Sequence, residues 1–211
     1  ERIKKVANII ASYIKKKYKV IVISSAMSGV TNDLVRKSGK ISNEFDAQEL
    51  DALLSTGEQV ACSLLAGRLS HLGFNSRSWL GWQIPIITSG KHNSSKIINI
   101  NKKKIYKYLK SGGIPIIAGF QGVNLKGQIT TLGRGGSDTS AIMVAKFFKA
   151  FKCIIYTDVI GVMTTDPRVF NKAKKIKVIS YEEMLEMSSL GSKVMQSSSV
   201  QESRLNRIDV E

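Results

Sequence analysis

Short apolar runs that alternate with amphipathic segments constrain the fold of this chain most. Val20 to Ile23 and Ile114 to Ala118 are uninterrupted apolar runs of strand length, which is typical of buried strands in a parallel sheet. Segments with helical spacing of apolar residues lie between such runs, and the long one from Asp46 to Leu72 ends at Gly73. This alternation predicts an α/β fold, a three-layer αβα sandwich around a mainly parallel central sheet.

The positions of the elements follow from the same patterns. Ser180 and Glu183 have the S-x-x-E spacing of a capping box, which predicts the start of the last helix. We expect helices at 3–14, 102–110, 137–149 and 181–190, a short helix after the loop at 25–31, and either one long helix or two in succession at 46–72. We expect strands at 19–25, 74–80, 84–88, 96–100, 114–118, 128–132 and 153–158. In such a sheet, ligands bind outside the carboxyl ends of the strands, so the loops that follow the strands are the candidate sites.

The composition is that of a folded globular protein, with 43% hydrophobic and 23% charged residues in 211. No apolar run approaches the ~20 residues that span a bilayer, and the start at Glu1 has no signal-peptide pattern. Cys62 and Cys153 lack C-x-x-C spacing, and His71 and His92 are too few for a histidine metal centre. We therefore expect a cytoplasmic protein without a membrane partner or a metal site of its own.

The formal charge of +16 permits two interpretations. A strongly basic protein can bind nucleic acid. Here the lysines occur in scattered groups (15–17, 102–104 and 172–177) without interleaved aromatic residues, which favours solvated helix faces and no nucleic-acid partner. A positive field would also attract small acidic substrates.

The strongest candidate site is Thr130-Thr131-Leu132-Gly133-Arg134-Gly135-Gly136-Ser137-Asp138, where a strand leads through glycines into a helix. Glycine allows close approach of the backbone to a ligand, and the free N–H groups at a helix start attract anions. Arg134 adds a planar fork that suits a carboxylate or phosphate. The alternative is a tight turn in which Ser137 or Asp138 caps the helix.

Glu58 is the second candidate. It follows Leu54 by four residues and precedes Leu65 by seven, so it lies on the apolar stripe of the predicted helix. A buried carboxylate is costly unless it is paired, and Gly57 beside it costs about 1 kcal/mol relative to alanine. Two neighbouring residues that are each unfavourable in a buried helix together indicate a functional site. The alternative is a structural ion pair at a helix kink.

Three weaker candidates follow. Thr157 and Asp158 end an apolar strand, where a nucleotide could be bound, although the Gly and Asp-Pro pairs that follow are also ordinary turn residues. The loop from Ser25 to Thr31 is rich in hydroxyl groups, and Lys193 follows the predicted last helix. The chain has no GxxxxGK[ST] sequence and none of the protein-kinase motifs.

Taken together, these segments resemble the aspartokinases of the amino-acid kinase family. The likeness runs from residue 1 to about Met195, in the family's order. The motifs that carry it are Ser25-Ala26-Met27-Ser28-Gly29-Val30-Thr31-Asn32, Leu54-Ser55-Thr56-Gly57-Glu58-Gln59-Val60, Gly81-Trp82-Gln83, Ala118-Gly119-Phe120-Gln121-Gly122, Thr131 through Asp138, and Tyr156-Thr157-Asp158 through Asp166-Pro167-Arg168.

The resemblance implies transfer of the ATP γ-phosphoryl group to the β-carboxylate of L-aspartate, the first step of lysine, threonine and methionine biosynthesis. It implies that Glu58 faces the α-ammonium of aspartate, that Arg134 clamps a carboxylate, and that Asp138 orients catalytic lysines. Lys193 would offset charge on the transferring phosphoryl group, and Mg²⁺ would accompany ATP. The implied aspartate-binding residues are Ser25, Thr31, Glu58, Arg134, Gly135, Gly136 and Ser137, and the implied ATP-binding residues are Thr157, Asp158, Met163, Arg168 and Lys193.

The chain also departs from the family pattern. The family begins with a strand and a Lys-Phe-Gly-Gly-Thr-Ser loop that binds phosphates, and this sequence begins after it. We therefore expect residues 1–211 to be the catalytic domain without its first strand and without the regulatory ACT domains, with doubtful activity alone and with homo-oligomers in the full-length protein. Met163 stands where the family usually has tyrosine, and Ser197-Ser198 replaces the usual Pro-Arg.

Two other functions remain open from the sequence. A sister kinase of the same fold would act on glutamate, N-acetylglutamate or UMP, and the segments Gly57-Glu58-Gln59 and Arg134-Gly135-Gly136 are the features that discriminate against it. A basic, non-catalytic binding domain would bind DNA or RNA with steep salt dependence.

Overall fold

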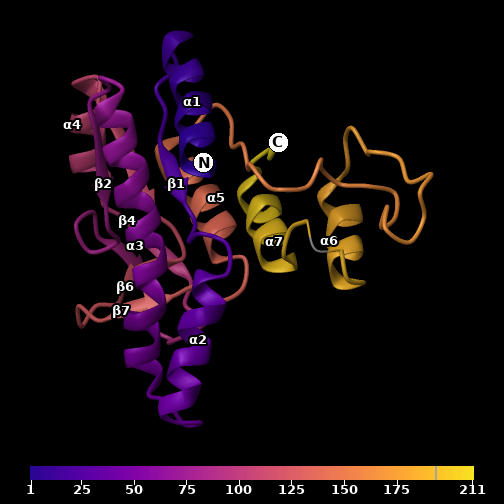
Figure 1. Cartoon of the computed structure of the whole chain (residues 1–211), viewed down its shortest axis with the longest axis horizontal. Coiled ribbons are helices and arrows are strands. Elements are labelled where there is room, and N and C mark those ends of the chain that lie inside the picture. Colours follow the sequence, from indigo (N-terminus) through magenta and orange to yellow (C-terminus); the bar gives the residue numbers. More distant parts are fainter. Residues whose placement is uncertain (193) are drawn as a thin grey trace.

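The computed structural model describes residues 1–192 and 194–211. Helices and strands alternate along most of this chain (Figure 1). The helices are α1 (Arg2–Lys15), α2 (Val30–Ile41), α3 (Ala47–His71), α4 (Lys103–Lys110), α5 (Gly136–Phe148), α6 (Tyr181–Ser189) and α7 (Ser197–Asn206). The strands are β1 (Val22–Ser24), β2 (Ser76–Trp79), β3 (Ile86–Thr88), β4 (Ile97–Ile100), β5 (Ile114–Ala118), β6 (Gln121–Val123) and β7 (Ile129–Thr131). None of the described helices combines the length and apolar character needed to cross a bilayer.

The strands form two sheets. The first has the order β1-β5-β2 and is entirely parallel, with Val22 opposite Ile116 and Trp79 opposite Ile117. The second has the order β4-β3-β6-β7, in which β3 and β6 are parallel and the two outer pairs are antiparallel. The predicted α/β class with a mainly parallel central sheet is confirmed, and the antiparallel hairpins of the second sheet add to it.

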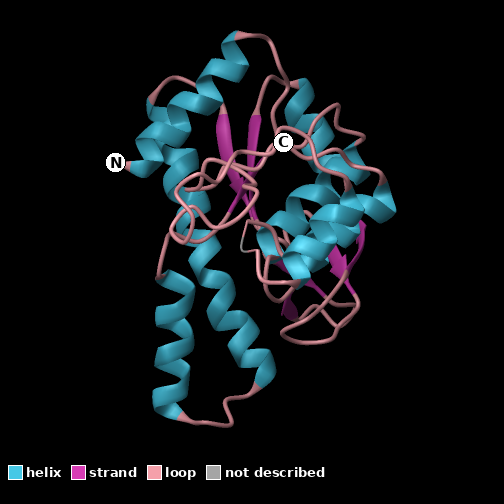
Figure 2. Cartoon of the chain, turned by 90° about the vertical axis from the view of Figure 1, so that its right-hand side faces the viewer, coloured by secondary structure: helices cyan, strands magenta, loops and turns pink. Residues whose placement is uncertain are grey.

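Strand β5 explains the layering, because successive side chains of a strand point to opposite faces. Ile114 and Ile116 pack with Ala7 of α1 and Leu69 of α3 on one face. Ile117 packs on the other face, in a second cluster built from β3, β4, α4 and α5. All five residues of β5 are buried, as its wholly apolar sequence predicts. Helices therefore cover both faces of the strands, as Figure 2 shows.

Capping residues fix the starts of two helices, and the sequence predicts one of these caps. Asp46 caps α3, because its carboxylate accepts hydrogen bonds from the N–H groups of Gln48 (2.9 Å) and Glu49 (3.0 Å). Ser180 and Glu183 form the predicted capping box at the start of α6. Helix α3 is one continuous helix through Gly57, and not two helices in succession.

Two expectations about the last third of the chain are wrong. The strand expected at 153–158 reduces to a single parallel bridge between Cys153 and Val210, flanked by a hydrogen bond from Ile155 N–H to Glu211 O of 2.8 Å. Tyr156 to Ile160 are exposed, and no described strand pairs with them. Helix α6 is also not the last helix, because α7 follows it. Figure 1 shows α6 and the segment before it standing away from the sheets, with α7 between them and α5.

A buried carboxylate connects helix α3 with the second sheet. Asp51 of α3 has no exposed surface and accepts hydrogen bonds from His92 Nδ1 (2.7 Å), the Asn93 N–H (3.1 Å) and the Thr131 hydroxyl. These donors lie in the β3–β4 loop and at the end of β7. A fully buried charge persists only when it is hydrogen-bonded on all sides, so this carboxylate fixes α3 against the second sheet.

We expect Asp51→Ala to destabilise the protein by about 3–5 kcal/mol, because it leaves the donors of His92, Asn93 and the buried Thr131 without their shared acceptor. Urea-induced unfolding followed by far-UV circular dichroism measures the loss. Glu49→Ala, an exposed acid on the same helix, is the matched control and should change stability by less than about 1 kcal/mol. Equal losses in the two variants would contradict the assigned role of Asp51.

Candidate active site

A pocket of about 480 Å³ lies where β1 and β5 end, between α3 and the start of α5. It collects residues from five separate stretches of the chain. All seven predicted aspartate-binding residues and the predicted catalytic Asp138 line it, as do six further residues. The predicted ones are Ser25, Thr31, Glu58, Arg134, Gly135, Gly136, Ser137 and Asp138, and the further ones are Ala26, Leu54, Asn93, Phe120, Thr131 and Gly133.

The glycine turn forms one wall of this pocket. Gly135 has φ +69°, in the left-handed region that favours glycine, and α5 begins at the next residue. Side chains pack against the turn so closely that a Cβ on Gly135 would lie 2.7 Å from Gln196, and one on Gly136 would lie 2.5 Å from the Phe120 ring. Packing therefore favours glycine at both positions, and the backbone conformation favours it at Gly135 as well.

The start of α5 supplies donors to the pocket. The first backbone hydrogen bond of the helix runs from the Thr139 N–H to the Gly135 carbonyl (3.0 Å). Within the described chain, the N–H groups of Ser137 and Asp138 have no hydrogen-bond acceptor. Unsatisfied N–H groups at a helix N-terminus, together with the helix dipole, favour an anion. The guanidinium of the exposed Arg134 adds a positive charge at the same end of the pocket.

Glu58 contributes a carboxyl group to the lining of the same pocket. Only 4% of this residue is exposed, and its Oε1 accepts a hydrogen bond from the Ala26 N–H at 3.1 Å. Its Oε2 is buried and has no hydrogen-bond partner among the described residues. Burial raises the pKa of the Glu58 carboxyl to about 7, and the Ala26 N–H opposes part of that rise. The alternative of a structural ion pair lacks support, because no described cation pairs with Glu58.

Gly57 explains how the loop after β1 reaches Glu58. A Cβ on Gly57 would lie 3.0 Å from the Cβ of Ala26 and 3.3 Å from a methyl group of Val30. A larger residue in α3 would push this loop away, and the Ala26 N–H with it. The glycine that lowers the helix propensity of α3 thus allows the contact that holds Glu58 in place.

Asp138 lies half-buried in the first turn of α5. Burial raises the pKa of its carboxyl above the ordinary value. The same carboxyl is close enough to Cys153 to raise the pKa of that thiol, although burial is the larger cause there. Asp138 therefore lies between the pocket and the segment that follows α5.

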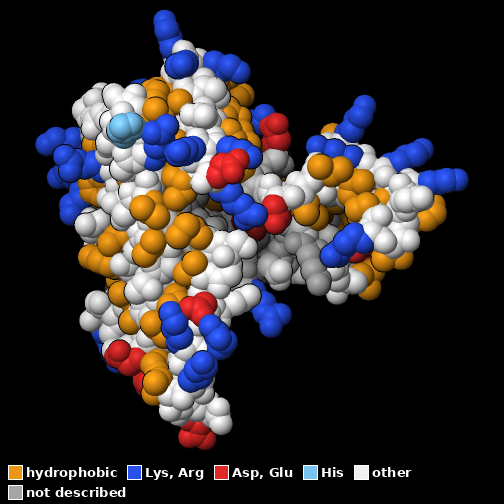
Figure 3. Space-filling view, in the orientation of Figure 1, with side chains coloured by type: hydrophobic (Ala, Val, Ile, Leu, Met, Phe, Trp, Pro, Cys, Tyr) orange, Lys and Arg blue, Asp and Glu red, His pale blue; other side chains and the backbone are white. Residues whose placement is uncertain are grey.

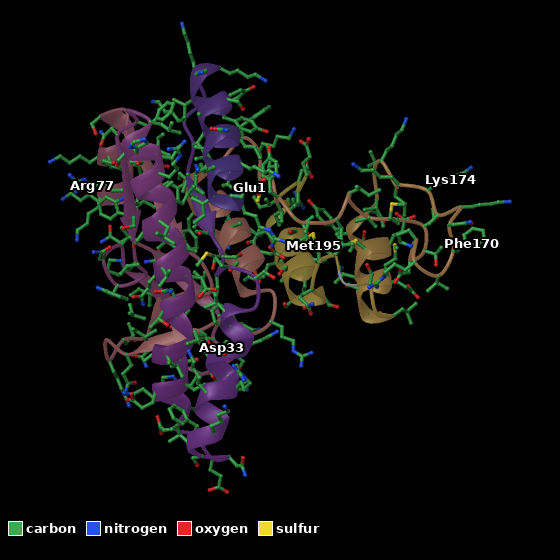
Figure 4. All side chains as sticks on the ribbon, viewed as in Figure 1. Glu1, Asp33, Arg77, Phe170, Lys174 and Met195 are labelled. Atoms are coloured by element: carbon green, nitrogen blue, oxygen red, sulfur yellow. The ribbon has the colours of Figure 1, made fainter. Side chains whose placement is uncertain are left out.

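The predicted ATP-binding residues that the structure describes do not line this pocket. Thr157 and Asp158 are exposed in the segment between α5 and α6, and the backbone of Met163 forms a bridge with Lys175. Arg168 pairs with Asp166 at 2.7 Å. In Figure 4 the labelled Phe170 and Lys174 mark the far side of this segment, away from the sheets. Lys193 lies outside the described residues.

Asn93 is a pocket residue that the sequence analysis did not identify. It has φ +59°, and Asp51 accepts its N–H while also bonding His92. Its carbonyl oxygen would lie 3.1 Å from a Cβ on Gly133, so this loop packs directly against the glycine turn. Asp51 precedes Glu58 by seven residues on the same helix face, and that spacing is the signal that could have identified Asp51.

Comparisons with known proteins agree with this geometry. An aspartokinase of Geobacillus stearothermophilus is 50% identical over 195 residues, which cover 92% of this chain and 48% of that protein. The crystal structure of aspartate kinase from Synechocystis has a TM-score of 0.85 at 38% identity, and the match covers 99% of this chain and 35% of that one. E. coli aspartokinase III, solved in complex with aspartate and ADP, has a TM-score of 0.85 over 99% of this chain and 57% of its own. At 24% identity, that last likeness concerns the fold alone.

The chain spans about half the length of the curated relatives it matches. Residues 1–211 match the Amino acid kinase family throughout. The family match, the two-sheet α/β architecture and the position of the pocket at the strand ends agree, and the chain belongs to the amino acid kinase family.

Proposed function

We propose that this chain is the catalytic domain of an aspartate kinase, which transfers the γ-phosphoryl group of ATP to the β-carboxylate of L-aspartate. The observation that carries the proposal is the pairing of opposite charges in one pocket. The buried, incompletely hydrogen-bonded carboxylate of Glu58 suits an ammonium group, while Arg134 and the start of α5 suit a carboxylate. An amino acid with a second carboxylate matches both charges. The aspartokinase relative at 50% identity supports the same substrate.

In this proposal the protein acts by positioning and by electrostatic stabilisation. Glu58 pairs with the α-ammonium, and Arg134 with Gly135, Gly136 and Ser137 holds a carboxylate. Ser25 and Thr31 bring hydroxyl groups to the same substrate. An oxygen of the β-carboxylate attacks the γ-phosphorus, the bond from that phosphorus to the β,γ-bridging oxygen breaks, and the electron pair leaves with ADP.

The nucleotide would lie on the side of the segment between α5 and α6. Thr157, Asp158, Met163 and Arg168 would contact ATP, and Lys193 would offset charge on the transferring group. Asp138, between this segment and the pocket, would orient the catalytic cations. Mg²⁺ would arrive on the phosphates of ATP. We further propose that the protein acts in the cytoplasm as a homo-oligomer.

Nucleic-acid binding is the less favoured function. Figure 3 shows the Lys and Arg side chains spread over both parts of the face in view, and not gathered in one patch. A dispersed positive charge provides weak, salt-sensitive attraction for any polyanion without a specific surface.

A coupled assay of ADP release, performed on the product of the complete gene, tests the proposed activity. We expect turnover that depends on L-aspartate and not on glutamate, N-acetylglutamate or UMP. Turnover with UMP or N-acetylglutamate instead of aspartate would assign the protein to a sister activity of the same fold. No turnover with any acceptor, combined with steeply salt-dependent RNA or DNA binding, would favour the binding domain.

We expect Glu58→Gln to raise the KM for aspartate by about 100-fold, because a buried ion pair loses its anion, and to leave the KM for ATP nearly unchanged. The same change should raise the free energy of unfolding at pH 8 by a few kcal/mol, because it removes a buried carboxylate whose pKa burial raises to about 7. Glu49→Gln is the control on the exposed face of α3. Unaltered aspartate kinetics in Glu58→Gln would contradict the assignment.

The pH dependence follows from the same carboxyl. Because the pKa of Glu58 is raised to about 7 in the free protein, this group is largely protonated at pH 6 and cannot then pair with an ammonium. We expect kcat/KM for aspartate to increase with pH through about 7 and to level off above it, since this ratio reports groups of the free enzyme. A profile that is flat from pH 6 to 8, measured with saturating ATP, would argue against an ionised Glu58 in binding.

Arg134→Lys should raise the KM for aspartate by about 10- to 100-fold, because lysine cannot supply two parallel hydrogen bonds to one carboxylate. Steady-state kinetics with aspartate as the varied substrate measure the change. Arg36→Lys, on α2 and paired with Asp33 outside the pocket, is the matched control. The role of Arg134 would be refuted by equal KM values in the two variants.

A further inference from the structure

The glycine turn of the pocket is held from behind by the first turn of α7. Ser199 has no exposed surface, and its hydroxyl donates a hydrogen bond to the Gly135 carbonyl at 3.1 Å. The hydroxyl of Thr139 in α5 lies 3.0 Å from the same Ser199 oxygen. The neighbouring Ser198 hydroxyl reaches the Arg134 carbonyl at 3.4 Å. Two consecutive serines of α7 thus contact two consecutive peptide groups of the turn.

The Gly135 carbonyl accepts a second hydrogen bond, and this one links the Ser199 contact to the start of α5. It accepts the Thr139 N–H, the hydrogen bond with which α5 begins. Rotation of this carbonyl would break that bond and disturb the first turn of α5, which carries the N–H groups of Ser137 and Asp138, two residues that line the pocket. The Ser199 hydroxyl restrains this rotation, since a 0%-exposed hydroxyl has no water to replace its protein partner.

The shape of the turn depends on α7 as well. A Cβ on Gly135 would lie 2.7 Å from Gln196 and 3.0 Å from the Ser199 hydroxyl oxygen. At its other side α7 is joined to α6, through a 2.9 Å contact between the Ser188 and Ser197 hydroxyls and an ion pair of Arg204 with Glu182. Met195, labelled in Figure 4, packs at the junction of α7 with α5.

We propose that Ser199 is a positioning residue for the acceptor-binding turn, acting through the Gly135 peptide and not by touching the substrate. This inference rests on the proposed function for the identity of the acceptor, an amino acid with a second carboxylate. In this proposal, α7 orients the N–H groups at the turn from outside the pocket. Among the described residues, the hydrogen bonds of Ser199 reach only Gly135, Thr139, Gln196 and Ser203, none of which has a proposed role in ATP binding, so we expect its effect to be confined to the acceptor.

Ser199→Ala in the full-length protein tests the proposal, and Ser203→Ala is the matched control. Ser203 is also buried (2% exposed) on α7, one turn later, but among the described residues its hydroxyl bonds only within the helix, to the Ser199 carbonyl at 3.1 Å. We expect Ser199→Ala to raise the KM for aspartate by about 10-fold, with kcat and the KM for ATP within about threefold of wild type, because one buried hydrogen bond is lost. Ser203→Ala should leave all three unchanged. If the alanine variant unfolds, Ser199→Cys replaces it, because cysteine is similar in volume but a weak hydrogen-bond donor. We expect the same rise in the KM for aspartate, with kcat and the KM for ATP nearly unchanged.

Hydrogen–deuterium exchange provides a readout that does not require activity. Amides of residues 133–139 should exchange faster in Ser199→Ala than in wild type, and Ser203→Ala should not accelerate them. Equal exchange in this segment, or a KM for aspartate that rises no more than in Ser203→Ala, would overturn the proposal. A wild-type protein without aspartate-dependent turnover would count against the proposed function alone, because the exchange experiment still decides the role of Ser199.

Discussion

The carboxylate of Asp51 connects three parts of the chain that are distant in sequence, and the pocket depends on that connection. It bonds the β3–β4 loop through His92 and Asn93, and the end of β7 through Thr131. Thr131 and Asn93 then line the pocket, and the glycine turn follows Thr131 directly. A buried charge of this kind admits few alternative arrangements, because every donor that moves away leaves an uncompensated anion behind. The strand ends and the turn are therefore fixed before any ligand arrives.

Helix α3 carries a second buried carboxylate, that of Glu58, which is incompletely hydrogen-bonded. Asp51 has its oxygens satisfied by the protein, whereas Glu58, two turns further along, has one oxygen without a described partner. Burial without full hydrogen bonding destabilises the charged form and raises the pKa of Glu58 to about 7. A ligand ammonium would supply the missing interaction, so part of the stability given up at this position is regained on binding. On this helix face, the carboxylate with a structural role has its oxygens hydrogen-bonded, whereas the carboxylate with the proposed binding role has one oxygen without a described partner.

The sequence predicts most local structure here, because the signals are local. Helices α1, α3 and α5 follow from apolar periodicity, β5 from an unbroken apolar run, and α6 from its capping box. It does not predict α7, whose first turn is three serines with weak helix propensity and whose stability comes from packing on α5 and α6. The sequence also predicts a strand at 153–158, where the structure has a single bridge, between Cys153 and Val210. Strand formation depends on neighbouring strands, which the periodicity of one segment does not reveal.

In the candidate site too, the sequence reveals some residues and not others. Glu58 and the glycine turn stand out in the sequence because they violate local rules, a carboxylate on an apolar stripe and glycines at a helix start. Asn93 and Ser199 violate no rule, and their importance comes only from what they contact. The residues that would touch substrate are thus more visible in the sequence than those that hold them in place. Since a loose turn would weaken carboxylate binding even with Arg134 intact, the proposed activity depends on the supporting residues as well as on those that face the pocket.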